Sequence, residues 1–125
     1  MPDYVLGVDV GGTVAKAGLF TATGEEVAVA ARRTQMRTPQ PGYTERDMDN
    51  LWTAAAESIS NVLRTSKIPP AEIACIAPTG HGNGLYLVDD AGRPVRPGIV
   101  SPDTRAQGYV RRWYDEGVVD RVRPK

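Results

Sequence analysis

The sequence predicts an α/β fold built on a mixed β-sheet with one long helix packed against it. Two observations support this prediction. Apolar segments at 4–10, 14–20 and 26–34 are joined by short turns, which favours three antiparallel strands in a meander. A stretch with helical periodicity then leads to the apolar segment 71–77, and a strand–helix–strand connection of this length favours a parallel neighbour for the first strand.

The helix is expected to begin after Asp47 and to end before Pro69 and Pro70. Asp47 is a suitable N-cap, and Asp49 lies where the helix dipole favours a negative charge. The face that the helix should bury on the sheet consists of apolar residues at helical spacing: Leu51, Trp52, Ala55, Ile59, Val62 and Leu63.

The last third of the chain is expected to add a hairpin and a closing helix. A glycine-rich loop, 78–84, follows the fourth strand. Residues 85–95 are predicted to form the hairpin, and Ile99 and Val100 one more short strand. The segment 101–103, Ser-Pro-Asp, can cap a helix. The apolar residues of that helix are Ala106, Tyr109, Val110, Trp113 and Tyr114.

The composition favours a single domain, because the chain has 125 residues, of which 41% are hydrophobic. Fifteen basic residues balance fifteen acidic ones, which gives no support for a nucleic-acid or membrane partner. Without a secretory leader or an apolar run long enough to span a bilayer, a cytoplasmic location is expected. Cys75 is the only cysteine, so no intrachain disulfide can form, and its apolar setting predicts an inert thiol buried in a strand.

The turn after the first strand has the composition of a phosphate-binding loop. Gly11 and Gly12 leave no Cβ between the backbone N–H groups and an anion, and Thr13 and Lys16 add a hydroxyl and a cation nearby. Asp9 stands at the strand end, where a carboxylate would hold Mg²⁺ through water. This arrangement indicates metal-assisted phosphoryl transfer. A purely structural hairpin is the alternative, because Gly-Gly between apolar runs is also a hairpin signal.

Three segments together resemble the amino-terminal part of the FGGY family of carbohydrate kinases. They are Gly-Val-Asp-Val-Gly-Gly-Thr at 7–13, Pro-Gly-Tyr-Thr-Glu-Arg-Asp at 41–47 leading to Trp52, and Thr-Gly-His-Gly at 79–82 followed by 88–105. The resemblance covers nearly the whole chain. It implies the ribonuclease-H-like fold of the actin-like ATPases, with the chain forming part of the N-terminal domain.

The third segment resembles the xylulokinase pattern in part. Thr79 and Gly80 stand where that pattern has Gln-Met, and Ser101 and Pro102 stand where it has Trp-Asn. The likeness is closer to a branch of L-xylulose kinases, in which Gly-His-Gly and Ser-x-Asp occupy these places. A pentulose-like sugar or a polyol is the substrate class that this resemblance implies, with a reshaped pocket where the indole is replaced by Ser101.

The resemblance assigns roles to residues of this chain, with ATP and Mg²⁺ as cofactors and a small sugar as substrate. Asp9 would be the catalytic residue that organises Mg²⁺ and the ATP phosphates. The residues that would contact phosphate are Gly11, Gly12, Thr13 and Lys16. Those that would contact the sugar are Gly80, His81 and Asp103. Two alternatives stay open: His81 as a loop histidine bonded to nearby backbone, and Asp103 as no more than a helix N-cap.

In this family the aspartate that takes the proton from the attacking hydroxyl, and the domain that holds adenosine, lie beyond residue 125. Residues 1–125 are therefore expected to be part of an N-terminal domain, inactive alone and able at most to bind nucleotide weakly. Apolar surface that the missing part would cover is expected to favour self-association, for instance as a homodimer.

Two other functions remain as alternatives at the level of sequence. The ROK group of glucokinases and repressors shares the Asp-x-Gly-Gly-Thr turn, but this likeness explains only the first twenty residues. A non-enzymatic, actin-like nucleotide-binding module is the second alternative, and in it His81 would have no role.

Overall fold

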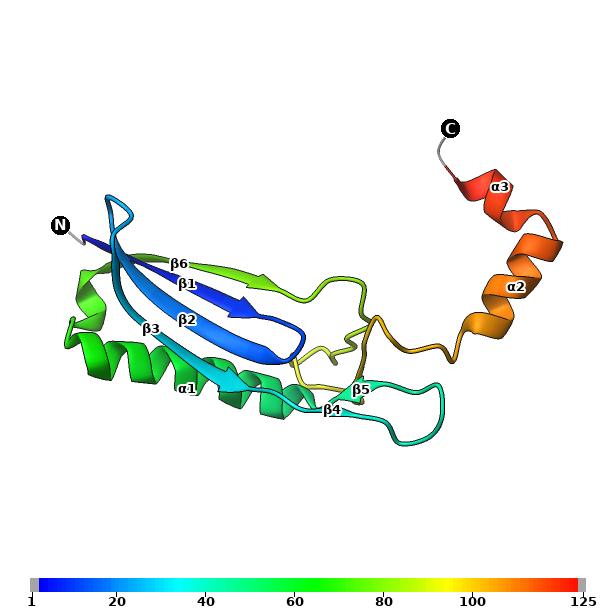
Figure 1. Cartoon of the computed structure of the whole chain (residues 1–125), viewed down its shortest axis with the longest axis horizontal. Helices are drawn as coiled ribbons and strands as arrows, with labels where there is room; N and C mark the ends of the chain where they lie inside the picture. Colours follow the sequence, from blue (N-terminus) through cyan, green and yellow to red (C-terminus); the bar gives the residue numbers. More distant parts are fainter. Residues whose placement is uncertain (1–2, 124–125) are drawn as a thin grey trace.

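The main sheet has four strands, and the computed structural model describes them within residues 3–123. They are β1 (Tyr4–Val10), β2 (Val14–Thr21), β3 (Glu26–Arg33) and β6 (Ile73–Gly80), in the order β3-β2-β1-β6. The pairs β1–β2 and β2–β3 are antiparallel, and β1–β6 is parallel (Figure 1). The predicted meander with a parallel fourth strand is confirmed.

One long helix, α1 (Met48–Ser66), lies against one face of this sheet, mainly over β2 and β3 (Figure 1). Asp47 is its N-cap, as predicted, and accepts a hydrogen bond from the N–H of Asn50 at 3.1 Å. Lys67 ends it in the left-handed conformation, and the short 3₁₀ helix Pro70–Glu72 leads into β6. The core between helix and sheet consists of Leu6, Val8, Ala15, Ala17, Leu19, Ala54, Ala55 and Val62.

The prediction that Trp52 belongs to the buried face of α1 is wrong. Its exposed fraction is 76%, whereas Ala54, Ala55 and Val62 face the sheet. A bulky indole at the contact would hold the helix away from β2, whose inward residues there are alanines. Small residues on both sides let the two elements approach closely, and Trp52 is turned toward a neighbouring groove.

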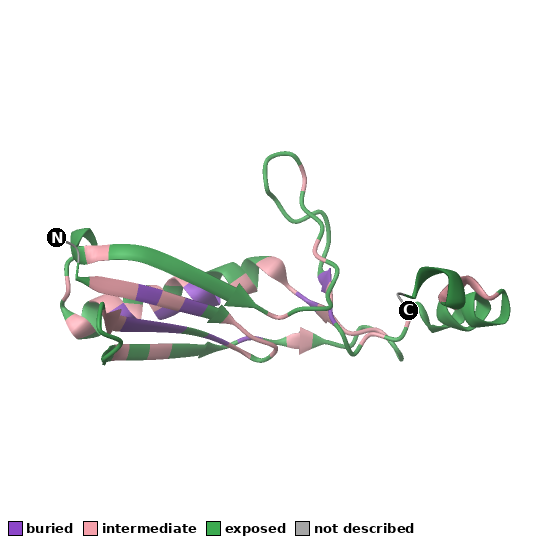
Figure 2. Cartoon of the chain, turned by 90° about the horizontal axis from the view of Figure 1, so that it is seen from above, coloured by how far each residue is buried: buried purple, intermediate pink, exposed green. Residues whose placement is uncertain are grey.

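The prediction that Cys75 is buried is also wrong. Cys75 is exposed, as is nearly all of β6 (Figure 2). The physical reason is that α1 covers β1, β2 and β3 and leaves β6, an edge strand, without a covering element among residues 3–123. The apolar composition of this strand is typical of one that packs on both faces, which is why the sequence favoured burial.

A second, smaller sheet is formed by strands of two residues each. They are β4 (Met36–Arg37), β5 (Glu45–Arg46) and β7 (Gly98–Ile99), in the antiparallel order β4-β5-β7. Of these three strands the sequence predicted only β7, which was expected at Ile99 and Val100, one residue later than it is observed. The hairpin at 85–95 is present, with a bridge from Val88 to Pro94.

The chain continues into α2 (Gln107–Asp115) and α3 (Val118–Val122), which lie apart from the main sheet (Figure 1). The expected closing helix is confirmed, but its cap is not: the N-cap is Ala106, and no side chain caps it. The α3 helix was not predicted. Among the helices of residues 3–123, none has the combined length and apolar character that crossing a membrane requires.

Replacing Leu19 with alanine is expected to lower the free energy of unfolding by about 2–5 kcal/mol, because its fully buried side chain would leave a cavity under α1. Chemical denaturation measures this. Leu87→Ala is the matched control: Leu87 is 42% exposed on the hairpin, and its loss is expected to change the unfolding free energy by about 0.5 kcal/mol. Equal losses for the two variants would contradict the assigned core.

Candidate active site

The glycine turn between β1 and β2 has two engaged carbonyl groups, those of Gly11 and Thr13, and two N–H groups that donate to no backbone carbonyl within residues 3–123. The N–H of Gly11 donates to the carbonyl of Val14 at 2.9 Å and closes the turn. The carbonyl of Gly11 accepts from Arg46 Nη2 at 2.9 Å, and that of Thr13 accepts from the N–H of Thr34 at 2.9 Å. Within residues 3–123, the N–H groups of Gly12 and Thr13 have no backbone acceptor. The turn therefore offers adjacent donors to an anion.

Asp9 and Lys16 are placed side by side by the sheet register. Asp9 pairs with Lys16 on β2 and with Thr79 on β6. Because neighbouring residues of a strand alternate between faces and Val8 belongs to the core, Asp9 points away from α1. All three residues line a shallow hollow of about 290 Å³ on that face. A carboxylate, a cation and a hydroxyl thus meet beside the glycine turn.

His81 lies next to the glycine turn. Its N–H donates to the carbonyl of Val10 at 3.0 Å, which extends the pairing of β1 with β6 past Gly80. A methyl group built on Gly12 would stand 3.7 Å from Cδ2 of the imidazole. The carboxyl ends of the parallel strands β1 and β6 meet at this edge, so the two predicted loops share one end of the sheet (Figure 1).

The imidazole of His81 is held by side-chain hydroxyl groups. Nε2 lies 3.2 Å from Ser101 Oγ, and Nδ1 lies 3.4 Å from Tyr86 Oη. The ring of Tyr86 fits between Gly84 and Gly98, where an added methyl group would approach it to 2.5 Å. The ring is thus bonded to side chains, and the backbone N–H of His81 is bonded to the carbonyl of Val10, so a contact between His81 and a sugar stays a prediction. The arrangement fixes the direction of the ring.

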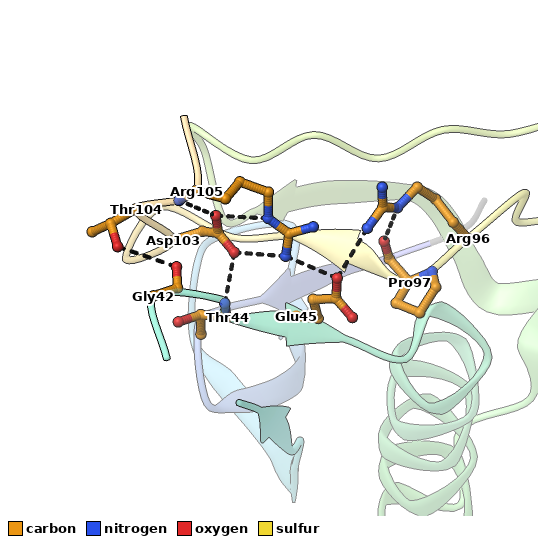
Figure 3. A network of polar contacts seen from close by, with 8 residues as sticks. All are labelled: Gly42, Thr44, Glu45, Arg96, Pro97, Asp103, Thr104 and Arg105. Atoms are coloured by element: carbon orange, nitrogen blue, oxygen red, sulfur yellow. Dashed lines mark hydrogen bonds and ion pairs between the residues drawn. The ribbon is translucent and has the colours of Figure 1, made fainter. Parts of the chain in front are cut away.

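Asp103 joins the segment 42–45 to the segment 101–105 (Figure 3). Its Oδ2 accepts from the N–H of Thr44 at 2.6 Å, and Arg105 donates to both of its oxygens, at 2.8 and 2.7 Å. Arg105 also reaches Glu45 Oε1 at 2.8 Å, and Arg96 reaches the same oxygen at 2.9 Å. The hydrogen bond from Arg105 is the main reason that the pKa of Asp103 lies well below its usual 3.8, and the pKa of Arg105 is raised in turn.

These contacts define what Asp103 does in the described chain. Its side chain is 3% exposed and is bonded on both oxygens, and it caps no helix, so the N-cap alternative is wrong. The hollow lined by Asp9 and Lys16 is not lined by His81 or Asp103. The turn, Asp9, Lys16, Gly80 and His81 are brought to one edge of the sheet, whereas Asp103 acts as a clamp between two loops. A contact between Asp103 and a sugar stays a prediction.

Asp103→Asn is expected to make the free energy of unfolding less dependent on pH in acid. A carboxyl group whose pKa is lowered by folding stabilises the fold above the unfolded pKa, and this contribution disappears as the pH falls through the lowered folded pKa. Denaturant unfolding measured between pH 7 and pH 2 should therefore show a steeper decline below about pH 4 for the wild type than for Asp103→Asn. Asp90→Asn, at an exposed loop carboxylate, should retain the wild-type slope; identical slopes for all three proteins would refute the clamp.

Comparison with known proteins decides the family. The N-terminal domain of the FGGY family of carbohydrate kinases matches residues 4–125. The chain belongs to this family. It has the α/β fold of the N-terminal domain of an actin-like ATPase, with the sheet β3-β2-β1-β6, the helix, the small sheet and the C-terminal helices. Because the match extends over nearly the whole chain, the ROK alternative, which rested on the first turn alone, is set aside.

Individual proteins that are similar to the chain support this assignment. A probable L-xylulose kinase of Pasteurella multocida is 37% identical over 98% of this chain and 25% of its own length. A glycerol kinase of a Roseiflexus species is 35% identical over 100% of the chain and 25% of its length. The crystal structure of xylulose kinase from Rhodospirillum rubrum superposes with a TM-score of 0.79 and 30% identity, covering 90% of this chain and 23% of that one. The chain spans about a quarter of the length of the curated relatives it matches.

The sequence analysis did not identify the residues that support the glycine turn on its inner side. Arg46 and Thr34 hold its carbonyl groups, and Tyr86 positions His81. An arginine between Glu45 and Asp47 looks like part of a solvated loop, because arginine is seldom fully buried. Gly84 and Gly98, which flank the ring of Tyr86, were the available signal, because a residue without a Cβ leaves room for a large side chain.

Proposed function

We propose that this chain is the N-terminal part of an ATP-dependent carbohydrate kinase, which transfers the γ-phosphate of ATP to a hydroxyl group of a pentulose-like sugar or a polyol. The observation that carries the proposal is the proximity of Gly12 to the imidazole of His81, whose Cδ2 would lie 3.7 Å from a methyl group added at Gly12. An anion-binding turn beside a fixed polar ring suits a reaction between a phosphate and a sugar hydroxyl.

The phosphate side of the proposed site uses backbone and charge. The free N–H groups of Gly12 and Thr13 would bind phosphate oxygens, with Gly11 shaping the turn. Lys16 would supply a positive charge from the neighbouring strand. Such groups suit phosphoryl transfer, because negative charge is spread over several oxygens of the transferred phosphoryl group in the transition state.

Asp9 is the residue that would hold Mg²⁺ at this site. Its exposed carboxylate stands beside Lys16 and Thr79, and residues 3–123 contain no group of three or more His, Cys, Asp or Glu side chains able to hold a metal ion by themselves. One carboxylate fits a Mg²⁺ ion that keeps most of its waters and is bound mainly by phosphate oxygens. When bound, the ion would neutralise charge on the transferred phosphoryl group.

The sugar side would use His81 and the backbone at Gly80. A sugar hydroxyl group needs donors and acceptors of fixed direction, and the contacts of His81 with Ser101 and Tyr86 fix the ring. Asp103, predicted to contact the sugar, would act from behind by holding the loop that carries Ser101. Its two oxygens already have partners in residues 3–123.

The proposed location is cytoplasmic, and the proposed partners are the sugar and ATP. Self-association is proposed as well, through the apolar groove of about 1060 Å³ between α1, β6 and the hairpin, which Trp52, Ile76 and Val88 line.

The general base and the adenosine site would be supplied by chain following residue 125, so we expect residues 1–125 alone to release no ADP.

The experiment is a coupled assay of ADP release by the full-length kinase against a panel of ketoses and polyols. The names of the relatives include both L-xylulose kinase and glycerol kinase, so the panel contains L-xylulose, D-xylulose and glycerol. We expect ADP release that depends on one pentulose or polyol. Binding of MgATP with no dependence on any sugar would instead support the non-enzymatic, actin-like module.

A further inference from the structure

Arg46 is the largest fully buried side chain within residues 3–123, and it lies behind the glycine turn. It is 1% exposed, although it comes from the two-residue strand β5. Its Nη2 donates to the carbonyl of Gly11 at 2.9 Å and to Thr34 Oγ1 at 2.9 Å. Its Nε has no partner at all in the described chain. The guanidinium is thus held by neutral oxygens alone.

A buried cation with no anionic partner is unfavourable for the fold. No carboxylate within residues 3–123 lies within 4 Å of Arg46, whereas Arg105 has both Asp103 and Glu45. Removing a charge from water without a counter-charge destabilises a protein, and a neutral side chain of similar volume would avoid this penalty. The position therefore carries a charge that the fold itself does not use.

The bond from Arg46 sets the direction of the peptide between Gly11 and Gly12. In a planar trans peptide the C=O and the following N–H point in opposite directions. Because the Gly11 carbonyl is held inward, the N–H of Gly12 points outward from the same peptide plane. Two consecutive glycines would otherwise sample many conformations. Thr34 fixes the Thr13 carbonyl in the same way.

We propose that Arg46 is a positioning residue for phosphate binding, which fixes the Gly11–Gly12 peptide with its N–H outward and places an uncompensated positive charge behind it. This inference rests on the proposed kinase function. Phosphate groups on the outer side of the turn would provide the counter-charge that the fold lacks. The charge is buried, so it is screened by salt much less than a surface arginine would be.

The test measures KM for MgATP and for the sugar in the full-length kinase carrying Arg46→Met or Arg46→Lys. Arg46→Met removes both the charge and the hydrogen bond, and it should raise KM for MgATP about tenfold or more while KM for the sugar changes less than about twofold. Arg46→Lys keeps the charge and should fall between the wild type and Arg46→Met. Arg37→Met is the control: Arg37 lies on the adjacent strand β4, is 67% exposed, and should leave both constants unchanged.

Thr34→Val keeps the proposal testable if both Arg46 variants fail to fold. It removes one acceptor of the guanidinium and leaves the backbone bond to Thr13, so KM for MgATP should rise about threefold without a change in KM for the sugar. A wild type that turns over sugar, together with variants whose two KM values move equally or not at all, would overturn the role of Arg46 alone. A wild type without sugar-dependent ADP release would overturn the kinase function, and the role of Arg46 with it.

Discussion

Replacing Asp9 with alanine is expected to abolish the proposed sugar-dependent ADP release by the full-length protein, with kcat reduced by about 10³-fold or more. Asp9 is the carboxylate at the carboxyl end of β1, between Lys16 and Thr79, and it faces away from the core. Its loss removes the proposed anchor for Mg²⁺ without opening a cavity, because the side chain is exposed. The protein should therefore fold and still fail to transfer phosphate.

The control for Asp9 is Asp90→Ala, which removes the same charge from an exposed position in the hairpin turn. It should retain wild-type kcat and KM. Circular dichroism of both variants shows whether the fold is kept. Retained activity in a folded Asp9→Ala protein would contradict the proposed role of Asp9. Loss of activity in both variants would mean that the activity depends on the total charge of the protein and not on the position of Asp9.

His81→Ala is the second substitution with a large expected effect, this time on the sugar. Removing the imidazole deletes hydrogen bonds to a sugar hydroxyl and also leaves Ser101 and Tyr86 without their common partner. We expect KM for the sugar to rise about 10- to 100-fold and KM for MgATP to change less than about threefold. Steady-state kinetics with each substrate varied in turn gives the two values separately.

Tyr86→Phe is the matched control for His81. It removes the hydroxyl group that lies 3.4 Å from Nδ1 but keeps the ring between Gly84 and Gly98. The long contact predicts a rise of about twofold in KM for the sugar. If His81→Ala instead raised KM for MgATP more than KM for the sugar, the imidazole would belong to the nucleotide side.

The strands and the first helix could be predicted because their signals are local. Alternating apolar residues and short turns indicated β1, β2 and β3 within a residue or two at each end, and Asp47 indicated the start of α1. The parallel pairing of β6 followed from the length of its connection. The two-residue strands β4 and β5 could not be predicted, because they are defined by pairing partners distant in the sequence.

Exposure was harder to predict than secondary structure. Cys75 and Trp52 are apolar and lie in the expected elements, yet both face solvent in the described chain. A pattern indicates which side chains favour burial, but it does not say which element will cover them. Arg46, on β5, shows the reverse case: it is a charged residue that is buried because two distant segments, at Gly11 and Thr34, converge on it.

The sequence indicated the main residues of the candidate site but not the partners that hold them. Gly11, Gly12, His81 and Asp9 could be found from the resemblance and from the chemistry of phosphate and metal binding. The partners that orient them could not, because a hydrogen bond between residues 20 or 35 positions apart leaves no mark on local sequence. The role of Asp103 as a clamp depends on the contacts with Thr44 and Arg105.

An NMR titration of the ¹⁵N-labelled chain with ATP and Mn²⁺, whose paramagnetism broadens nearby resonances, tests whether nucleotide and metal bind at the glycine turn. Phosphates and metal seated at the turn beside His81 should selectively broaden the amide signals of Gly12 and Thr13 and the imidazole signals of His81. Those of Gly92, at the tip of the hairpin, and Gly117, between α2 and α3, should stay sharp. Selective broadening around Gly92 or Gly117, with Gly12 and His81 unaffected at saturating nucleotide, would show that the nucleotide and metal do not bind at the glycine turn.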